Sequence, residues 1–289
     1  MTRRSRWSLA LLPAMLAAAV AASAAGAAGG PTPGIAYGWD GVRADTALRY
    51  VTLPGMGSTA VSAIRTRDGR VLRYGTLAGE LGIPLVAFDG TAGGLSHDGA
   101  TLVLASWTPQ FTPDTKTTFA VLGTRSLREK QRFELPGLWA FDALSPDGST
   151  IFAVRYLSPN APDRYEVRAI DARTGTVAAG AIVDKREPDE EMRGQPLSRT
   201  TDVAGRWAYT LYGKPDGTGF VHALDTVKRA AACIDLPWHG VQDALWGVRM
   251  SVDRGGTTLT LRQQGRGRLA VVDLKGLAVR AFKAPVAVR

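Results

Sequence analysis

Short apolar runs broken by tight turns recur along the chain from residue 31 onward. Val, Ile, Phe, Tyr and Thr dominate these runs, as in strands that are packed on both faces. Four segments share one pattern, an apolar strand, a tight turn and a second apolar strand: residues 93–106, 142–156, 198–212 and 248–263. No segment after residue 30 carries a long apolar period of about 3.6 residues, so we expect little helix.

The turn glycines set the period of this repeat. If Gly99, Gly148, Gly205 and Gly255 are equivalent, the intervals between them are 49, 57 and 50 residues. The extra length of the second interval falls in a polar insertion, residues 184–195. A period of about 40 to 50 residues with several short strands per unit is typical of propeller blades.

A second pair of strands follows each turn, so that each unit supplies about four strands. The predicted pairs are residues 118–123 with 132–135, 165–171 with 176–183, 220–225 with 232–236, and 268–273 with 278–283. A degraded unit precedes them, with strands at residues 34–39, 48–53, 60–66 and 70–77. We therefore predict an all-β fold, a single β-propeller of about five four-stranded blades over residues 31–289. Closure through residues 34–39 is one option, and four blades with an irregular start is another.

The segments ALSPDGSTIFAVRY and YEVRAIDARTGTV, both in the second unit, resemble the repeat of YVTN and related WD-like β-propellers of exported bacterial proteins. In that repeat an inner strand ends in Ser-Pro-Asp-Gly, and a later strand ends in Ile-Asp shortly before a Gly. The resemblance is good over residues 93–273 and loose over 34–289. It implies a propeller fold whose ligands meet the loops between blades, and it implies no particular activity. The third and fourth turns depart from the motif.

The first 30 residues read as a signal peptide. Three arginines within the first six residues precede an uncharged run rich in Ala and Leu that ends in small residues, the pattern of a cleavable secretory signal. Residues 7–28 are also long enough for an uncleaved membrane anchor, which needs about 20 residues. Ala is only weakly apolar and Pro13 interrupts the run, which favours cleavage. We predict a secreted or extracytoplasmic protein of the cell envelope, with an N-terminal membrane anchor as the alternative.

Composition agrees with an ordinary globular protein. The 289 residues are 45% hydrophobic and 21% charged, and the formal net charge is +9, which excludes collagen-like, mostly disordered and polytopic membrane proteins. A single cysteine, Cys233, rules out an intramolecular disulfide. The last unit is basic, so an anionic envelope polymer or lipid headgroup is a conceivable partner, whereas nucleic acid is not expected outside the cytoplasm.

Loops that join an outer strand to the next inner strand hold the residues best placed to meet a ligand. These loops are residues 78–93, 136–140, 185–199 and 237–246. The ligand-binding candidates in or beside them are Trp139, Asp142, Arg193, Trp238, His239 and Trp246. Aromatic rings with adjacent polar groups could line a site for a sugar, a peptide or a small apolar ligand. Alternatively, the tryptophans close the core between blades at its rim.

The sequence predicts no catalytic residue, no metal site and no cofactor. The three histidines, His97, His222 and His239, lack the spacing of a zinc site. A Gly-x-Ser-x-Gly nucleophile motif is missing, and Gly93-Gly94 opens a strand rather than a helix. The acidic residues of the polar insertion lack the spacing of a calcium loop.

We therefore expect a non-catalytic binding or scaffold module that engages a protein, glycan or cell-envelope component through its loop face. The alternative is a propeller enzyme, glycoside hydrolase-like or lactonase-like, that uses carboxylates at the channel. Its candidate carboxylates are Asp40, Asp89, Asp142 and Asp243. An enzyme would show two of them converging at the channel mouth with perturbed pKa values, whereas a binding module would show an aromatic or charged patch without that pair.

Overall fold

The structure is a computed structural model that describes residues 31–36, 38–189 and 191–287. Within these residues the chain forms twenty strands and one short helix, α1 (Gln242–Leu245), and is nearly all β. No described helix is long and apolar enough to cross a membrane. The predicted signal peptide, residues 1–30, lies outside the described residues.

The strands make six small antiparallel sheets. A two-stranded sheet pairs β1 (Ile35–Ala36) with β6 (Ile83–Pro84). The first larger sheet holds β2 (Val42–Arg43), β3 (Leu48–Gly55), β4 (Ser58–Arg65) and β5 (Val71–Ala78), and the second holds β7 (Thr101–Ala105), β8 (Lys116–Gly123) and β9 (Arg128–Pro136). The third holds β10 (Trp139–Leu144), β11 (Thr150–Ser158) and β12 (Ala161–Asp171). The fourth holds β13 (Gln195–Thr201), β14 (Trp207–Gly213), β15 (Gly219–Asp225) and β16 (Ala230–Asp235), and the fifth holds β17 (Val248–Val252), β18 (Thr258–Gln263), β19 (Gly267–Asp273) and β20 (Ala278–Ala281).

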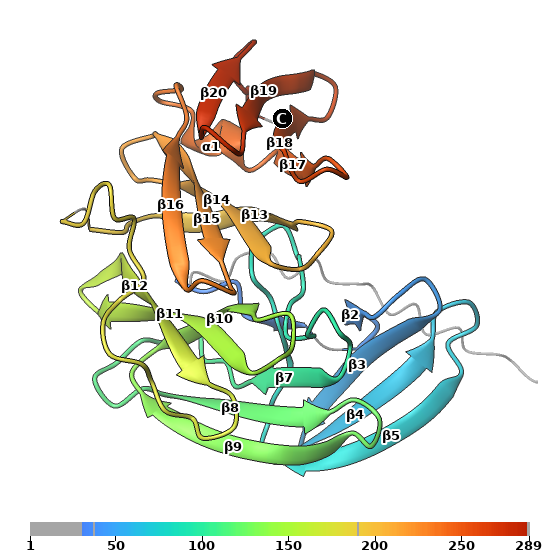
Figure 1. Cartoon of the computed structure of the whole chain (residues 1–289). Helices are drawn as coiled ribbons and strands as arrows, with labels where there is room; N and C mark the ends of the chain where they lie inside the picture. Colours follow the sequence, from blue (N-terminus) through green and yellow to red (C-terminus); the bar gives the residue numbers. More distant parts are fainter. Residues whose placement is uncertain (1–30, 37, 190, 288–289) are drawn as a thin grey trace, which may run out of the picture.

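The larger sheets stand side by side in an arc (Figure 1). Their first strands, such as β7 and β10, lie on the inner side of the arc, and their last strands, such as β9 and β12, on the outer side. Apolar clusters fill the space between each sheet and the next. Within each larger sheet the strands follow the order of the sequence. This radial packing of meandering sheets confirms the all-β prediction and supports a propeller fold.

A turn near the start of the second, third, fourth and fifth sheets repeats with the same hydrogen bonds. In the last three it joins the first two strands, and in the second sheet it precedes β7 and follows Leu95, which bridges to Leu102. One side-chain oxygen accepts the backbone N–H five residues further on, at 2.7–2.9 Å, in Ser96, Ser145, Asp202 and Asp253. The glycine three residues after each of them has a φ between +65° and +72°. At the fourth turn that glycine is Gly256. The expectation that Gly255 is the equivalent of Gly99, Gly148 and Gly205 was therefore wrong. The third and fourth turns depart from Ser-Pro-Asp-Gly without a change of geometry, because an aspartate offers the same acceptor as a serine.

The first larger sheet does not begin where the sequence pattern suggested. Residues 34–39 were expected to form its first strand, but Ile35–Ala36 pairs with β6 instead. The first strand is β2, which pairs with β3. Gly41 permits this pairing, since a Cβ atom there would lie 1.9 Å from the carbonyl oxygen of Tyr50. The predicted strand at residues 176–183 is likewise reduced to one bridge, between Val177 and Ile170.

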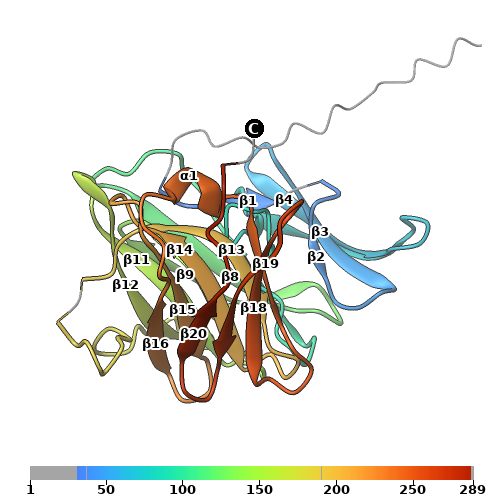
Figure 2. The same cartoon turned by 90° about the horizontal axis from the view of Figure 1, so that it is seen from above.

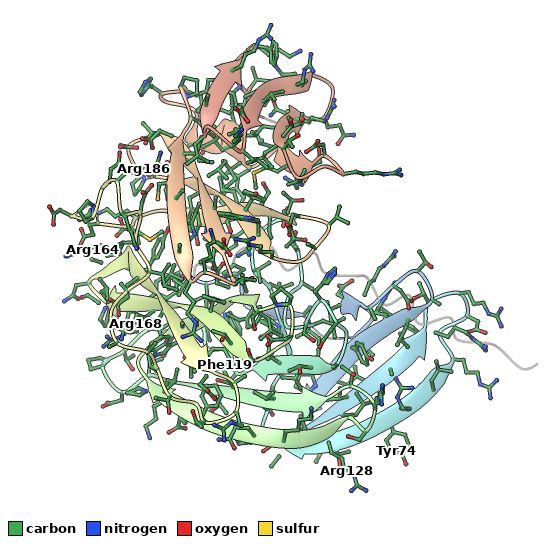
Figure 3. The ribbon with its side chains drawn as sticks, viewed as in Figure 1. Tyr74, Phe119, Arg128, Arg164, Arg168 and Arg186 are labelled. Atoms are coloured by element: carbon green, nitrogen blue, oxygen red, sulfur yellow. The ribbon has the colours of Figure 1, made fainter. Side chains whose placement is uncertain are left out.

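The polar insertion between the third and fourth sheets is held by its own ion pairs. Arg186 contacts Asp184 at 2.5 Å, and Arg193 contacts Glu191 at 2.9 Å. The hydrogen bond from Arg186 lowers the pKa of Asp184 to about 2. Figure 3 shows Arg164 beside β12 and Arg186 beside β16, where Arg186 donates a hydrogen bond to the carbonyl oxygen of Cys233. Asp184 and Glu191 of the insertion are thus each paired with an arginine of the same segment.

Candidate functional site

The six predicted ligand-binding residues do not form one cluster. Trp139 and Trp238 are 6% and 5% exposed. Trp139 packs in the apolar cluster between the second and third sheets, and Trp238 in the cluster between the fourth and fifth. The indole N–H of Trp139 donates to the carbonyl oxygen of Pro136 at 2.9 Å, and the guanidinium of Arg155 lies 5.7 Å from its ring centre. Both tryptophans therefore occupy positions that fit the alternative expectation, closure of the core at its rim.

Arg193 lies in the polar insertion. Its side chain is half exposed and contacts Glu191 at 2.9 Å and Asp163 at 3.8 Å. Its backbone bridges to Arg164 of β12. Its guanidinium is therefore engaged with carboxylates of the insertion and of β12.

Trp246 follows α1, and Figure 2 shows that helix at one end of the sheets. Its side chain is 37% exposed. The ring contacts Phe88, with ring centres 5.5 Å apart at an angle of 58°. Phe88 belongs to the connection between β6 and the second sheet, far from Trp246 in the sequence.

That connection crosses the inside of the arc. The backbone N–H groups of Phe88 and Asp89 donate to the carbonyl oxygens of Pro196 and Leu197 in β13, at 2.8 and 3.1 Å. The Asp89 side chain accepts hydrogen bonds from the N–H and hydroxyl of Thr91. A loop of the second sheet is thereby fixed to the first strand of the fourth.

Arg249, in β17, lies next to Asp89. Its Nε lies 3.8 Å from Asp89 Oδ2, and its side chain is 55% exposed. We name Phe88, Asp89, Trp246 and Arg249 the loop-face patch. Sequence reasoning named Trp246 and Asp89 but missed Phe88 and Arg249. Phe88 stands in a Phe-Asp-Gly turn and Arg249 in a strand, so neither carried a signal of its own.

His239 is exposed in the connection between β16 and α1. Of the six candidates, Trp246 belongs to the loop-face patch, and His239 lies in the same predicted loop, residues 237–246.

Asp142 lies elsewhere, in a cavity of about 460 Å³ on the inner side of the arc. Residues of β10 and β13 line it together with residues 91–97. Asp142 forms an ion pair with Nη2 of Arg199, and both side chains are only 3% exposed. The turns of the second and fourth sheets meet beside this cavity, since a Cβ atom on Gly205 would lie 2.6 Å from His97.

The carboxylates proposed for an enzyme are in different environments. Asp40 and Asp243 are exposed, whereas Asp89 contacts Thr91 and Arg249, and Asp142 contacts Arg199. Among the described residues, each carboxyl with a resolved pKa shift has its pKa lowered by hydrogen bonds or nearby arginines: Asp68, Asp147, Asp171, Asp184, Glu191, Asp216, Asp225 and Asp253. Within the same residues, no three His, Cys, Asp or Glu side chains come together as a metal site requires.

A shallow groove of about 740 Å³ lies on the outer side, between β5 and the start of β9. Tyr74 and Arg128 line it, and Figure 3 shows both at the outer edge of the arc. It contains none of the predicted site residues.

No protein-family model matches this chain, and neither does any curated protein. Solved structures similar to it include the Dos1 propeller, at 11% identity and a TM-score of 0.44, over 82% of this chain and 56% of that one. The β-propeller domain of Cps50 (Swd1) from Myceliophteria thermophila is similar at 10% identity and a TM-score of 0.46, over 86% of this chain and 67% of that one.

A puromycin-hydrolyzing peptidase of Mycobacterium tuberculosis is similar at 16% identity and a TM-score of 0.44. That match covers 84% of this chain and 38% of the peptidase. The chain thus spans little more than half of the Dos1 propeller and a smaller part of the peptidase. At these identities and TM-scores the likenesses carry no argument about function, and the description of the fold rests on this chain's own sheets.

Proposed function

We propose that this chain is an exported, non-catalytic binding module that engages a protein, a glycan or another cell-envelope component through its loop face. The observation that carries the proposal is the loop-face patch, where a partly exposed tryptophan contacts Phe88 beside the Asp89–Arg249 pair. Exposed aromatic rings with an adjacent guanidinium are the groups that dominate binding energy at protein surfaces. The exposed His239 lies in the same predicted loop as Trp246, residues 237–246.

In this proposal five propeller blades present the loop face. Each of the five larger sheets is one blade in this proposal, and residues 31–289 form one propeller domain. The short pair β1–β6 is an addition wedged between the first two blades, since Ile83 packs with Val61 and Leu102. The first and fifth sheets stand at the two ends of the arc (Figure 1).

Export rests on residues 1–30, the predicted signal peptide. A cleaved signal gives a mature protein that starts near residue 30 in the culture fluid or the cell envelope. Intact-mass measurement of the protein from these fractions tests this step, and a full-length membrane-bound protein would favour the anchored alternative.

A propeller enzyme has less support. A general acid needs a carboxyl whose pKa is raised, whereas the resolved pKa shifts of described carboxyls are downward. Asp89 and Asp142 are each engaged by a guanidinium. Turnover of a glycoside or lactone panel by the purified protein would nevertheless overturn the non-catalytic proposal.

The binding test uses immobilised protein and three probes from the source organism: washed cell wall, membrane vesicles and the secreted protein fraction. We expect one probe to bind saturably, and a Trp246→Ala, Arg249→Ala variant to lose at least tenfold in affinity. Trp39→Ala is the matched control, because Trp39 is 65% exposed and its ring packs beside Gly69 in the turn between β4 and β5. Equal binding by the loop-face variant and the wild type would contradict the proposal.

A further inference from the structure

The inner cavity contains two buried polar atoms that the protein leaves without a partner. Asp142 uses Oδ1 and Arg199 uses Nη2 for their ion pair, while Asp142 Oδ2 and Arg199 Nε are buried and have no hydrogen-bond partner among the described residues. Buried polar atoms of native proteins are almost always hydrogen-bonded, so each exception needs an explanation. These two atoms require one acceptor and one donor from outside the protein.

Both residues are placed by the repeat. Asp142 stands three residues before the turn residue Ser145, and Arg199 stands three residues before Asp202. The register of β10 against β11 shifts at Asp142, which is the extra residue of a β-bulge. Bulges re-aim side chains and are frequent beside binding sites. Neighbouring sheets thus present opposite charges from the same repeat position to one cavity.

The cavity is large enough for more than ordered water. Its volume of about 460 Å³ falls in the range of roughly 300–1,000 Å³ that small-molecule pockets occupy, whereas one water needs about 30 Å³. Phe141 and Val86 provide apolar lining, and Thr91 and Thr200 provide hydroxyls. This mixture suits a molecule that has both C–H faces and polar edges.

We propose that the cavity binds a neutral, multiply hydroxylated small molecule of monosaccharide size. The Asp142–Arg199 pair has no net charge, so a charged ligand group placed against it would be buried without compensation. A hydroxyl both donates and accepts a hydrogen bond. Ligand hydroxyls therefore satisfy the carboxylate oxygen and the guanidinium N–H together. Arg43 also lines the cavity, but it is exposed, and solvent and salt weaken the effect of its charge.

The experiment titrates the full chain by calorimetry with three matched sets of probes. The first set contains neutral hexoses, pentoses and polyols, the second the corresponding sugar acids and the third the amino sugars. We expect saturable binding by at least one neutral probe, and at least tenfold weaker binding by its charged counterparts.

The variant that tests the site carries Asp142→Leu and Arg199→Leu together, because apolar replacement of a whole buried ion pair is tolerated better than loss of one partner. We expect it to fold, with its thermal transition retained, and to lose at least tenfold in affinity for the neutral probe. The control pair, Lys116→Ala with Glu134→Ala, removes an exposed ion pair at 2.9 Å and leaves the affinity unchanged.

If the double variant does not fold, the same affinity is measured with Thr200→Val and with Phe141→Leu, and either variant is expected to weaken binding. The proposal is overturned if no neutral probe binds, if a charged probe binds more tightly than the neutral ones, or if a folded cavity variant keeps the wild-type affinity. None of these measurements involves the loop-face patch. A negative result would overturn the cavity proposal and leave the proposed function untouched.

Discussion

The two faces of the fourth sheet, β13–β16, pack against different kinds of neighbour. Alternate residues along β14 and β15 point to opposite faces. Toward the fifth sheet they present Leu211 and Val221, which pack with Leu261 in a cluster of apolar side chains. Toward the third sheet they present Tyr212 and His222 beside the Asp142–Arg199 pair. One sheet therefore combines an apolar interface with a polar and aromatic one. Figure 1 shows this sheet between the third and the fifth.

The polar face is built from rings in contact. Tyr212 stacks on Tyr165 and on Phe220, with ring centres 5.3 and 5.2 Å apart, and its edge meets His222 at 6.3 Å. Burial raises the pKa of Tyr212 and of Tyr165 well above the ordinary tyrosine value. Apolar contacts tolerate a shifted neighbour, whereas paired charges and oriented rings tolerate few arrangements. The contrast suggests that the apolar face supplies stability and the polar face fixes how the third and fourth sheets meet.

The largest effect should come from removing half of the buried ion pair. Arg199→Leu leaves Asp142 buried without its counter-charge, and we expect the free energy of unfolding to fall by about 4 kcal/mol. The double replacement, Asp142→Leu with Arg199→Leu, should recover most of that loss. Urea denaturation of the three proteins measures both quantities. A double variant as unstable as the single one would show that packing, and not charge, governs this face.

The apolar face should respond to lost volume alone. Leu261 is fully buried, and Leu261→Ala should lower the free energy of unfolding by about 3 kcal/mol through lost burial and the cavity left behind. Val227→Ala is the control, since Val227 is 59% exposed and its replacement should change stability by less than about 0.5 kcal/mol. If the Leu261 variant recovered stability when pH or salt is changed, charge would also govern the apolar face, and the contrast between the two faces would be wrong.

The smallest expected effect is a pH dependence confined to the polar face. Burial lowers the pKa of His222 to about 4. The unfolded chain takes up a proton near pH 6.5 while the folded protein does not, so stability is fully present above pH 6.5 and is lost as the pH falls toward 4. Between pH 7 and pH 5 the loss should be about 2 kcal/mol.

His222→Gln should flatten this dependence, although its stability at pH 7 is expected to be lower, and the exposed His239→Gln should keep the wild-type slope. Denaturation curves at half-unit pH intervals provide the test. Lowered carboxyl pKa values, such as that of Asp184 at about 2, act mainly below this window. A wild-type slope in the His222 variant would assign the pH dependence to other groups.

The sequence predicted the repeating parts of this molecule well because each is local. A side-chain oxygen that accepts an N–H five residues away, followed by a glycine at positive φ, needs no distant partner to form. The third and fourth turns use aspartate for serine, and the pattern of apolar strands around them still revealed the repeat. The start of the first sheet was predicted less well, because Gly41 and the pairing of β1 with β6 depend on contacts with strands elsewhere in the chain.

The candidate site shows the same division. Trp246 and Asp89 could be singled out as polar or aromatic residues in predicted loops, but Phe88 and Arg249 became part of the patch only through a loop that crosses to β13. Asp142 was chosen for its place next to a loop, whereas its partner Arg199, 57 residues away, carried no signal in the sequence. Burial of that pair is a property of two sheets and not of either segment.

By itself the sequence determined that the chain folds into repeated antiparallel sheets, because alternation of apolar residues and turn chemistry act over a few residues. Only the tertiary structure decided which charges meet, which rings are buried and where a cavity remains. Those outcomes depend on side chains brought together across sheets, and the energy of a charge or a ring is set by the neighbours that surround it after folding.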